Sequence, residues 1–159
     1  MLMNIVKKTK EKRNRYMKEK RNRQFINSIK EGNLYKIRKV LEKGEVDLNI
    51  KCNYAFIYAC AKGYTNIVRF LLEKGVDPNV ENGKGLLLAC AKGNLSIVKL
   101  LIIYRVDIHT PDIEGNPDGA LTYAYINNNY HIVQYLLKFY SSKKIKFFNL
   151  MKFKMNIER

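Results

Sequence analysis

The sequence predicts an all-α solenoid of about four helix-turn-helix repeats, with basic helical extensions at both ends. The pentapeptide ACAKG occurs twice, at residues 59–63 and 89–93, thirty residues apart. The two 22-residue segments that begin there keep one register without a slip. Weaker copies of the same pattern flank them, in residues 27–50 and 124–140. A fixed period of this length is typical of stacked repeats, in which each unit buries its apolar face only against its neighbours.

The first helix of each copy is expected to end at a glycine, which accepts the left-handed conformation that closes a helix. Gly32, Gly63 and Gly93 stand at this position in the first three copies. Asn128 replaces the glycine in the last copy, and asparagine is the next best residue for a left-handed conformation.

The second helix of each copy is predicted from apolar pairs, such as Ile67-Val68 and Leu71-Leu72, which lie on one helical face. It is expected to end at Gly44, at Gly75 and, in the third copy, at Arg105. A turn then follows, and its Asp and Asn side chains favour bonds to their own backbone, as in Asp77-Pro78-Asn79.

The helices of neighbouring repeats are expected to approach closely at the small residues Ala59 and Ala89. Cys60 and Cys90 occupy equivalent positions of adjacent repeats. Stacked helices lie about 8–10 Å apart, too far for a disulfide, so we expect two buried thiols.

The repeat resembles the ankyrin repeat. The family pattern Ala-Ala-x-x-Gly is matched by residues 59–63, its Ile/Val-Val-x-x-Leu-Leu by residues 67–72, and its Gly-Ala-Asp-x-Asn by residues 75–79. The resemblance covers about residues 24–138, and two copies match strongly. It implies an ankyrin solenoid with repeats at roughly 24–50, 51–80, 81–110 and 111–138.

The chain also departs from the family. The Thr-Pro-Leu-His segment that usually opens the first helix is absent, and the repeat is 30 residues long rather than 33. We therefore expect short turns, with residues 81–85 forming a hairpin turn rather than a phosphate-binding loop. A longer loop rich in Pro, Gly and Asp is expected over residues 108–120.

The net charge of +16 is concentrated at the two ends of the 159-residue chain. Residues 7–23 hold ten Lys/Arg against two acidic residues, and residues 138–159 hold seven against one. Residues 1–23 are expected to form a basic helix that runs into the first repeat. Two origins are open for the charge: a lysine-rich composition typical of A/T-rich codons, or selection for an anionic partner.

The C-terminal tail, residues 139–159, mixes lysines with apolar side chains. Four of them fall on one helical face, Ile145, Phe148, Met151 and Met155. Such a helix could cap the last apolar face of the stack, or it could anchor the chain to a membrane or a partner.

The sequence gives no indication of an enzyme. His109 and His131 are the only histidines, and no nucleophile, metal-ligand spacing or cofactor motif accompanies them. Three cysteines do not make a disulfide framework, and no apolar run is long enough for a membrane span. We expect a monomer without a cofactor or metal, located inside the cell in the cytoplasm or nucleus. Export by a non-classical route would leave no recognisable mark.

The resemblance implies that another protein binds the concave face, which is built from turn tips and from exposed positions of the first helices. The turn positions carried over are Asn53, Asn82, Lys84, Glu114 and Asp118. The helix positions are Lys30, Glu31, Ala61, Lys62, Ala91, Lys92, Ile126 and Asn127. Lys62 and Lys92 are expected to form a basic row.

The alternative function is binding of nucleic acid or an anionic surface through the basic ends. The N-terminal residues that would act as a nucleic-acid or nuclear-import arm are Lys7, Lys8, Lys10, Lys12, Arg13, Arg15, Lys18, Lys20, Arg21 and Arg23. A solvated helix without a partner is a third interpretation of this segment.

Overall fold

The computed structural model describes residues 2–44, 46, 48–112, 114, 115, 117–142 and 145. This part of the chain contains eight helices and no strand. The helices are α1 (Leu2–Lys30), α2 (Leu34–Glu42), α3 (Leu48–Lys62), α4 (Thr65–Glu73), α5 (Val80–Ala91), α6 (Leu95–Ile103), α7 (Gly119–Ile126) and α8 (Tyr130–Leu137). The predicted all-α solenoid of four helix pairs is confirmed.

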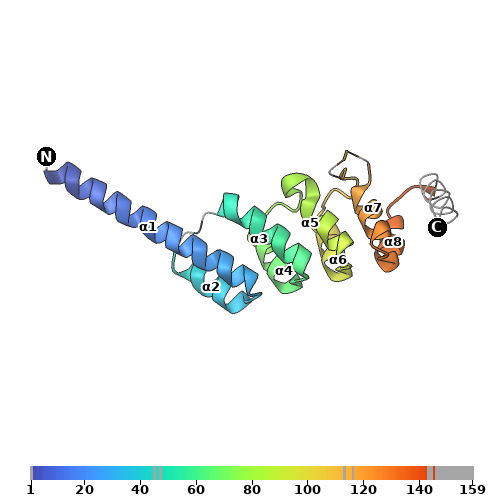
Figure 1. Cartoon of the computed structure of the whole chain (residues 1–159), viewed down its shortest axis with the longest axis horizontal. Coiled ribbons are helices and arrows are strands. Elements are labelled where there is room, and N and C mark those ends of the chain that lie inside the picture. The colour runs from blue at the N-terminus through green and yellow to red at the C-terminus, as the bar shows by residue number, and fades with distance from the viewer. Residues whose placement is uncertain are drawn as a thin grey trace.

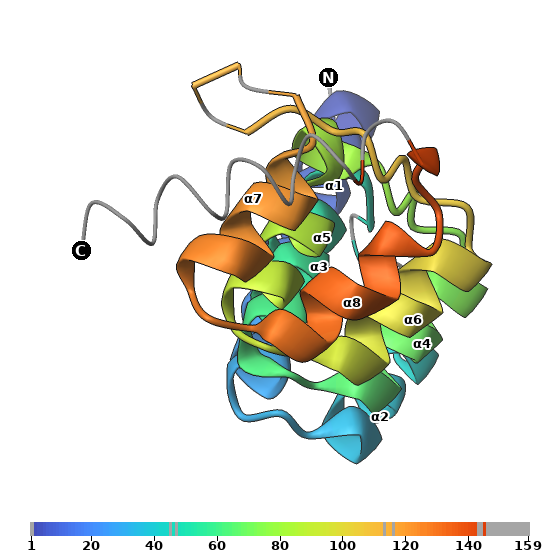
Figure 2. The ribbon, with the colours of Figure 1, turned by 90° about the vertical axis from the view of Figure 1, so that its right-hand side faces the viewer.

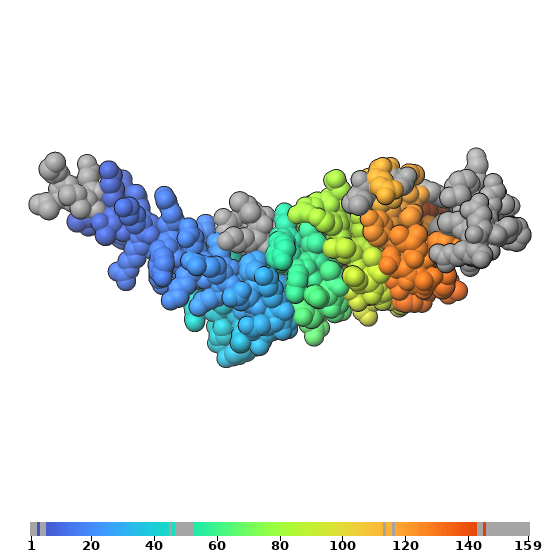
Figure 3. All heavy atoms as spheres, viewed as in Figure 1, coloured from blue at the N-terminus to red at the C-terminus, as the bar shows by residue number. Residues whose placement is uncertain are grey.

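The helices form two layers, seen along the stack in Figure 2. Helices α1, α3, α5 and α7 make one layer, which we call the inner layer, and α2, α4, α6 and α8 make the outer layer. Neighbouring inner helices approach each other more closely than neighbouring outer helices do. In Figure 3 the outline is bent, with the N-terminal helix and the last repeats rising on the same side.

Small residues explain the close approach within the inner layer. Ala59 and Ala89 are fully buried, as expected. A Cβ atom on Gly85 would lie 2.9 Å from Cε1 of Phe56 and 3.2 Å from the Sγ of Cys60. Helix α5 can therefore pack on α3 only because a residue without a side chain stands at position 85.

The loops between the two helices of each pair repeat almost unchanged, and together they form one edge of the stack, which we call the loop edge. Gly32, Gly63, Gly93 and Asn128 have φ values of 66°, 78°, 76° and 60°, which confirms the left-handed helix ends. The side chain of Asn94 donates to the carbonyl of Cys60 at 2.8 Å. Asn129 donates to the carbonyl of Cys90 at 2.8 Å in the next pair. Carbonyls at the end of one inner helix are thus satisfied by the following repeat.

The opposite edge of the stack, the turn edge, carries the connections between repeats. The backbone amides of Asn79 and His109 donate to the side chains of Asp77 and Asp107, at 2.9 and 2.8 Å, which confirms the expected turns. The backbone amide of Asp107 also donates to the Oδ1 of Asn79 at 2.8 Å and so links two successive turns.

The hairpin turn predicted over residues 81–85 is shorter in the structure, and residues 84 and 85 already belong to the regular part of helix α5. Glu81, Asn82 and Gly83 all have left-handed φ values, 49°, 54° and 66°, and they form a single tight turn inside the bounds of α5. A left-handed turn reverses the chain within very few residues. Such a short connection suits a repeat of 30 residues, three fewer than the usual 33. Gly83 is needed there, because a Cβ atom would lie 2.6 Å from the hydroxyl oxygen of Thr110.

Helix α1 continues without a break from Leu2 into the first repeat (Figure 1). Its residues 6–20 are all exposed, and we call residues 2–20 the arm. Phe25 and Ile29 are fully buried and attach the helix to the stack. At the other end Ile145 packs against the core, whereas Phe148, Met151 and Met155 lie outside the described residues.

Candidate partner-binding face

The exposed side of the inner layer is the candidate site, and we call it the inner face. On α5, Leu86, Leu87 and Cys90 point into the core, whereas Lys84 and Lys92 are exposed. The same alternation holds on α3. Because the inner helices are stacked in parallel, their exposed positions line up from one repeat to the next.

Three half-buried apolar side chains run across this face, Tyr58, Leu88 and Tyr123. Each lies five residues before the left-handed residue of the following loop (Gly63, Gly93 or Asn128), so they are equivalent positions of three repeats. We call them the apolar row. Tyr54 and Ile126 extend it, with 49% and 57% of their surfaces exposed.

The apolar row was not predicted from the sequence, because the helix positions carried over from the family were only the two directly before each glycine or Asn128. The available signal was the helical period. A residue four positions before Lys62 or Lys92 must share its face. The structure confirms this neighbourhood, since the Nζ of Lys62 lies 5.7 Å from the ring centre of Tyr58. The ring centres of Tyr54 and Tyr58 lie 6.0 Å apart.

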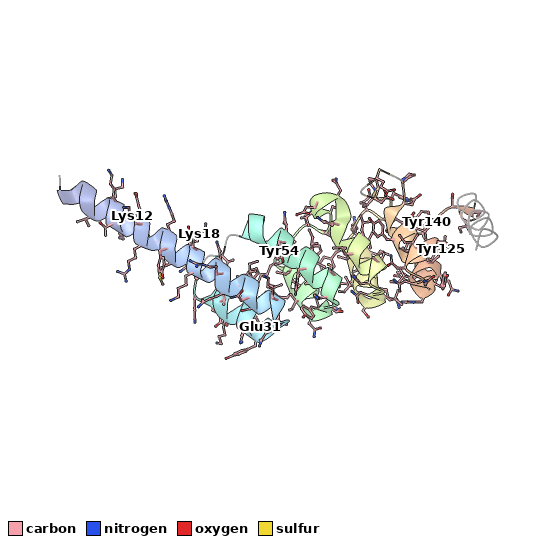
Figure 4. The ribbon with its side chains drawn as sticks, in the orientation of Figure 1. Lys12, Lys18, Glu31, Tyr54, Tyr125 and Tyr140 are labelled. Carbon is pink, nitrogen blue, oxygen red and sulfur yellow. The ribbon has the colours of Figure 1, made fainter. Side chains whose placement is uncertain are left out.

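Lysines border the apolar row at the loop edge. Lys30, Lys62 and Lys92 are all exposed. Two carboxylates already have cationic partners: Glu31 at the loop edge contacts Lys36 at 2.7 Å, and Glu81 at the turn edge contacts Lys84 at 3.0 Å. Figure 4 labels Glu31 at the loop end of α1 and Tyr54 on α3.

Most of the predicted contact residues are accessible. Those exposed are Lys30, Glu31, Lys62, Asn82, Lys84, Lys92, Glu114, Ile126 and Asn127. Those partly accessible are Asn53, Ala61 and Ala91, and Asn53 lies within helix α3 rather than at a turn tip as predicted.

Asp118 is the exception, with 7% of its surface exposed. Its Oδ1 lies 2.9 Å from the Nδ1 of His109, and it also interacts with Tyr140. This carboxylate closes the loop after residue 107, so we correct its assignment from partner contact to structural tie. The reason is that the longer loop folds back on itself and covers the carboxylate.

The cluster of His109, Asp118 and Tyr140 is the nearest approach to a catalytic arrangement in the described part of the chain. The ring centres of His109 and Tyr140 lie 5.0 Å apart, and the Tyr140 hydroxyl donates to the carbonyl of Ile108 at 3.2 Å. Burial, followed by the negative charge of Asp118, raises the pKa of Tyr140 well above its usual value. A phenol that is held protonated and already donates a hydrogen bond is a poor nucleophile.

The thiols of Cys60 and Cys90 are free and fully buried, as expected. Burial raises the pKa of both groups, that of Cys90 to about 12. They are therefore unreactive packing residues.

The described residues contain no group of three His, Cys, Asp or Glu side chains suited to a metal ion. None of their helices is long and apolar enough to cross a membrane.

The predicted arm residues lie along the free part of α1, where Figure 4 labels Lys12 and Lys18. Lys7, Lys8, Lys10, Lys12, Arg13, Arg15, Lys18, Lys20 and Arg23 are exposed. Arg21 is only partly exposed, and its guanidinium lies beside Gly44.

Two family models match the chain. Both are described as ankyrin repeats (many copies), and they match residues 40–89 and 86–137. Together they span the second half of the first repeat and the three repeats that follow. No curated protein matches the chain significantly.

Proposed function

Because the chain belongs to the ankyrin-repeat family, whose repeats serve as protein–protein interaction modules, we propose that it binds another protein through the inner face. The observation that carries this proposal is the apolar row, Tyr58, Leu88 and Tyr123, which lies partly exposed across three repeats. Aromatic side chains that are fixed by packing but open to solvent are typical anchors of protein interfaces.

The proposed mechanism is non-catalytic recognition by a rigid surface. The side-chain bonds of Asn94 and Asn129 hold successive repeats in one register before any partner arrives. A surface that is already ordered loses less conformational entropy on binding, so a few well-packed contacts suffice for affinity. We further propose that the protein acts as a monomer in a reducing compartment, in keeping with the free thiols of Cys60 and Cys90.

Site-specific photo-cross-linking tests this function. A photoreactive residue replaces Lys92 on the inner face or Lys99 on the outer helix α6, both exposed lysines of the same repeat. We expect Lys92 to yield a discrete protein adduct in cell lysate that survives nuclease and moderate salt, and Lys99 to yield none. Adducts from Lys99 alone would contradict the proposal.

A second candidate function is supported by the arm. Its residues 6–20 are exposed on every side, and basic side chains are distributed around the whole helix. A membrane-surface helix would need one apolar side, whereas a polyanion such as nucleic acid can be bound by a helix that is basic all round. We propose nucleic-acid binding by the arm as the alternative to protein recognition.

Salt dependence distinguishes this alternative. Binding of labelled single-stranded and duplex oligonucleotides is measured for the full chain and for a variant with Lys7, Lys8, Lys10, Lys12, Arg13 and Arg15 replaced by Gln. If the arm is the site, affinity falls steeply with salt, and the variant loses it. Equal binding by both proteins would exclude the arm.

A further inference from the structure

The chemistry of the inner face indicates which kind of protein segment it accepts. Tyr58, Leu88 and Tyr123 lie at equivalent positions, so their separation equals the spacing of stacked helices, about 8–10 Å. A chain in the polyproline II conformation advances about 3.1 Å per residue with three residues per turn, and therefore brings every third side chain to the next position on the same side. A ligand segment thus needs apolar side chains at a regular interval.

The charge around the apolar row is positive. Lys30, Lys62 and Lys92 are exposed at its loop-edge side. Glu31 at the loop edge and Glu81 at the turn edge are each engaged by a lysine of their own repeat, and exposed Glu114 lies in the loop before α7. An acidic ligand would therefore meet cations without displacing a neighbouring acid, while a basic ligand would meet repulsion.

The arm strengthens the same field. It is the N-terminal continuation of inner helix α1 and leaves the stack beside the inner layer (Figure 1). The arm carries eight Lys/Arg against two Glu. A basic extension next to a binding face raises the encounter rate of an acidic ligand without contacting it in the final complex.

We propose that the inner face binds an acidic protein segment that places apolar side chains on Tyr58, Leu88 and Tyr123 and carboxylates on Lys62 and Lys92. This inference rests on the proposed function and specifies its partner class. Lys30 and the arm contribute attraction at longer range.

A single-stranded nucleic acid also combines negative charge with flat apolar groups, but the row suits it less well. Base stacking needs successive open aromatic faces. Here Tyr58 is stacked against Tyr54 and bordered by Lys62, and the central member, Leu88, has no ring. The structure therefore favours aliphatic or aromatic side chains of a protein, and nucleic acid is an outcome that the test must separate.

The first experiment is selection of random peptides of about 12 residues, long enough to span three repeats when extended, against the full chain. We expect enrichment of Asp and Glu together with apolar residues at a regular interval. Selection of basic or uncharged peptides, or no enrichment over an unrelated bait, would overturn the inference. Tighter binding of an oligothymidine than of any selected peptide at the inner face would also overturn it.

The second experiment measures the affinity of a selected peptide for matched variants. Lys62→Glu with Lys92→Glu reverses the charge of the inner face, and Arg69→Glu with Lys99→Glu makes the same change at equivalent exposed positions of the outer layer. We expect the inner variant to bind about tenfold more weakly or worse, and the outer variant to change by less than about twofold. Equal losses would contradict a specific site.

A charge reversal in the peptide distinguishes a loss of charge complementarity from a folding defect of the variant. A peptide in which Asp and Glu are replaced by Lys should bind the Lys62→Glu, Lys92→Glu variant better than it binds the wild type. Failure of this rescue in a variant with a wild-type helical spectrum would overturn the charge assignment. If the peptides cross-link at Lys92 but are not acidic, the proposed function stands and only this inference fails.

Discussion

The two edges of the stack solve the same problem, the connection of one helix to the next, in different ways. At the loop edge every repeat uses a left-handed residue, and in the last two junctions an asparagine then bonds to the preceding repeat. At the turn edge one connection is a tight left-handed turn, and the next is a long loop held by His109 and Asp118. This comparison indicates that the regular loop edge contributes more to the free energy of unfolding. The turn edge, in contrast, accepts connections of different length and conformation.

The largest expected effect is at Gly93. Gly93→Ala places a Cβ atom 2.8 Å from the Oδ1 of Asn129, at a φ of 76° that disfavours any side chain. Gly75→Ala is the matched control, because φ is 88° there and no atom lies within 4 Å. We expect a loss of about 3 kcal/mol for Gly93→Ala and about 1–2 kcal/mol for Gly75→Ala in urea unfolding. Equal losses would show that the contact between repeats contributes nothing.

The next effect compares an asparagine of each edge. Asn94→Ala leaves the partly buried carbonyl of Cys60 without its side-chain donor, and we expect a loss of about 1–3 kcal/mol. Asn79→Ala removes an exposed bond to the amide of Asp107, which water can replace, and should cost about 0.5–1 kcal/mol. If Asn79→Ala proved the more damaging of the two in urea unfolding, the assignment of stability to the loop edge would be wrong.

The free energy of unfolding should also depend on pH, by a similar amount, because of the buried thiol of Cys90 in helix α5. Burial raises the pKa of Cys90 from 9.0 to about 12, so the folded state keeps a proton that the unfolded state releases above pH 9. Stability should therefore be complete below pH 9 and fall by about 1.4 kcal/mol as the pH rises to 10.

The control for this effect is Cys90→Ala, a change to a small residue without a titrating group. Thermal unfolding of both proteins is followed from neutral to alkaline pH. The wild type should lose stability more steeply than Cys90→Ala, and parallel curves would contradict burial of the thiol.

The smallest expected effect is a gain at the turn edge. Asn82 holds a left-handed conformation with a φ of 54° in the tight turn that opens α5. Asn82→Gly removes the strain of that conformation, and we expect a stabilisation of about 0.5 kcal/mol, reduced by the greater freedom of glycine in the unfolded chain. Exposed Asn127→Gly, which lies outside a left-handed turn, is the comparison and should not stabilise the protein. A destabilised Asn82→Gly would mean that the Asn side chain contributes to the turn.

The regular part of the fold could be predicted from the sequence because its signals are periodic. Gly32, Gly63 and Gly93 mark three helix ends in one register, and Asn128 marks the fourth. The turn edge could not be predicted in detail. Three left-handed residues at 81–83 have no sequence signature beyond Asn-Gly, and the contact of His109 with Asp118 depends on how a long loop folds back.

The candidate site was predicted in part for the same reason. Lys62 and Lys92 stand out because they recur within an identical pentapeptide. Tyr58, Leu88 and Tyr123 differ in identity, so their common position is visible only when the helices are stacked. The burial of Asp118 could not be inferred, because it depends on how the loop folds and on contacts with His109 and with Tyr140 after the last helix.

The direction of the asparagine bonds has a consequence for the growing chain on the ribosome. The carbonyl of Cys60 receives its side-chain donor from a residue 34 positions later, and that of Cys90 from one 39 positions later. At about 5–20 residues per second, each newly made helix pair waits some seconds for the group that completes it. Assembly therefore proceeds from the N-terminus, and these two carbonyls receive their side-chain donors only when the following repeat has been made.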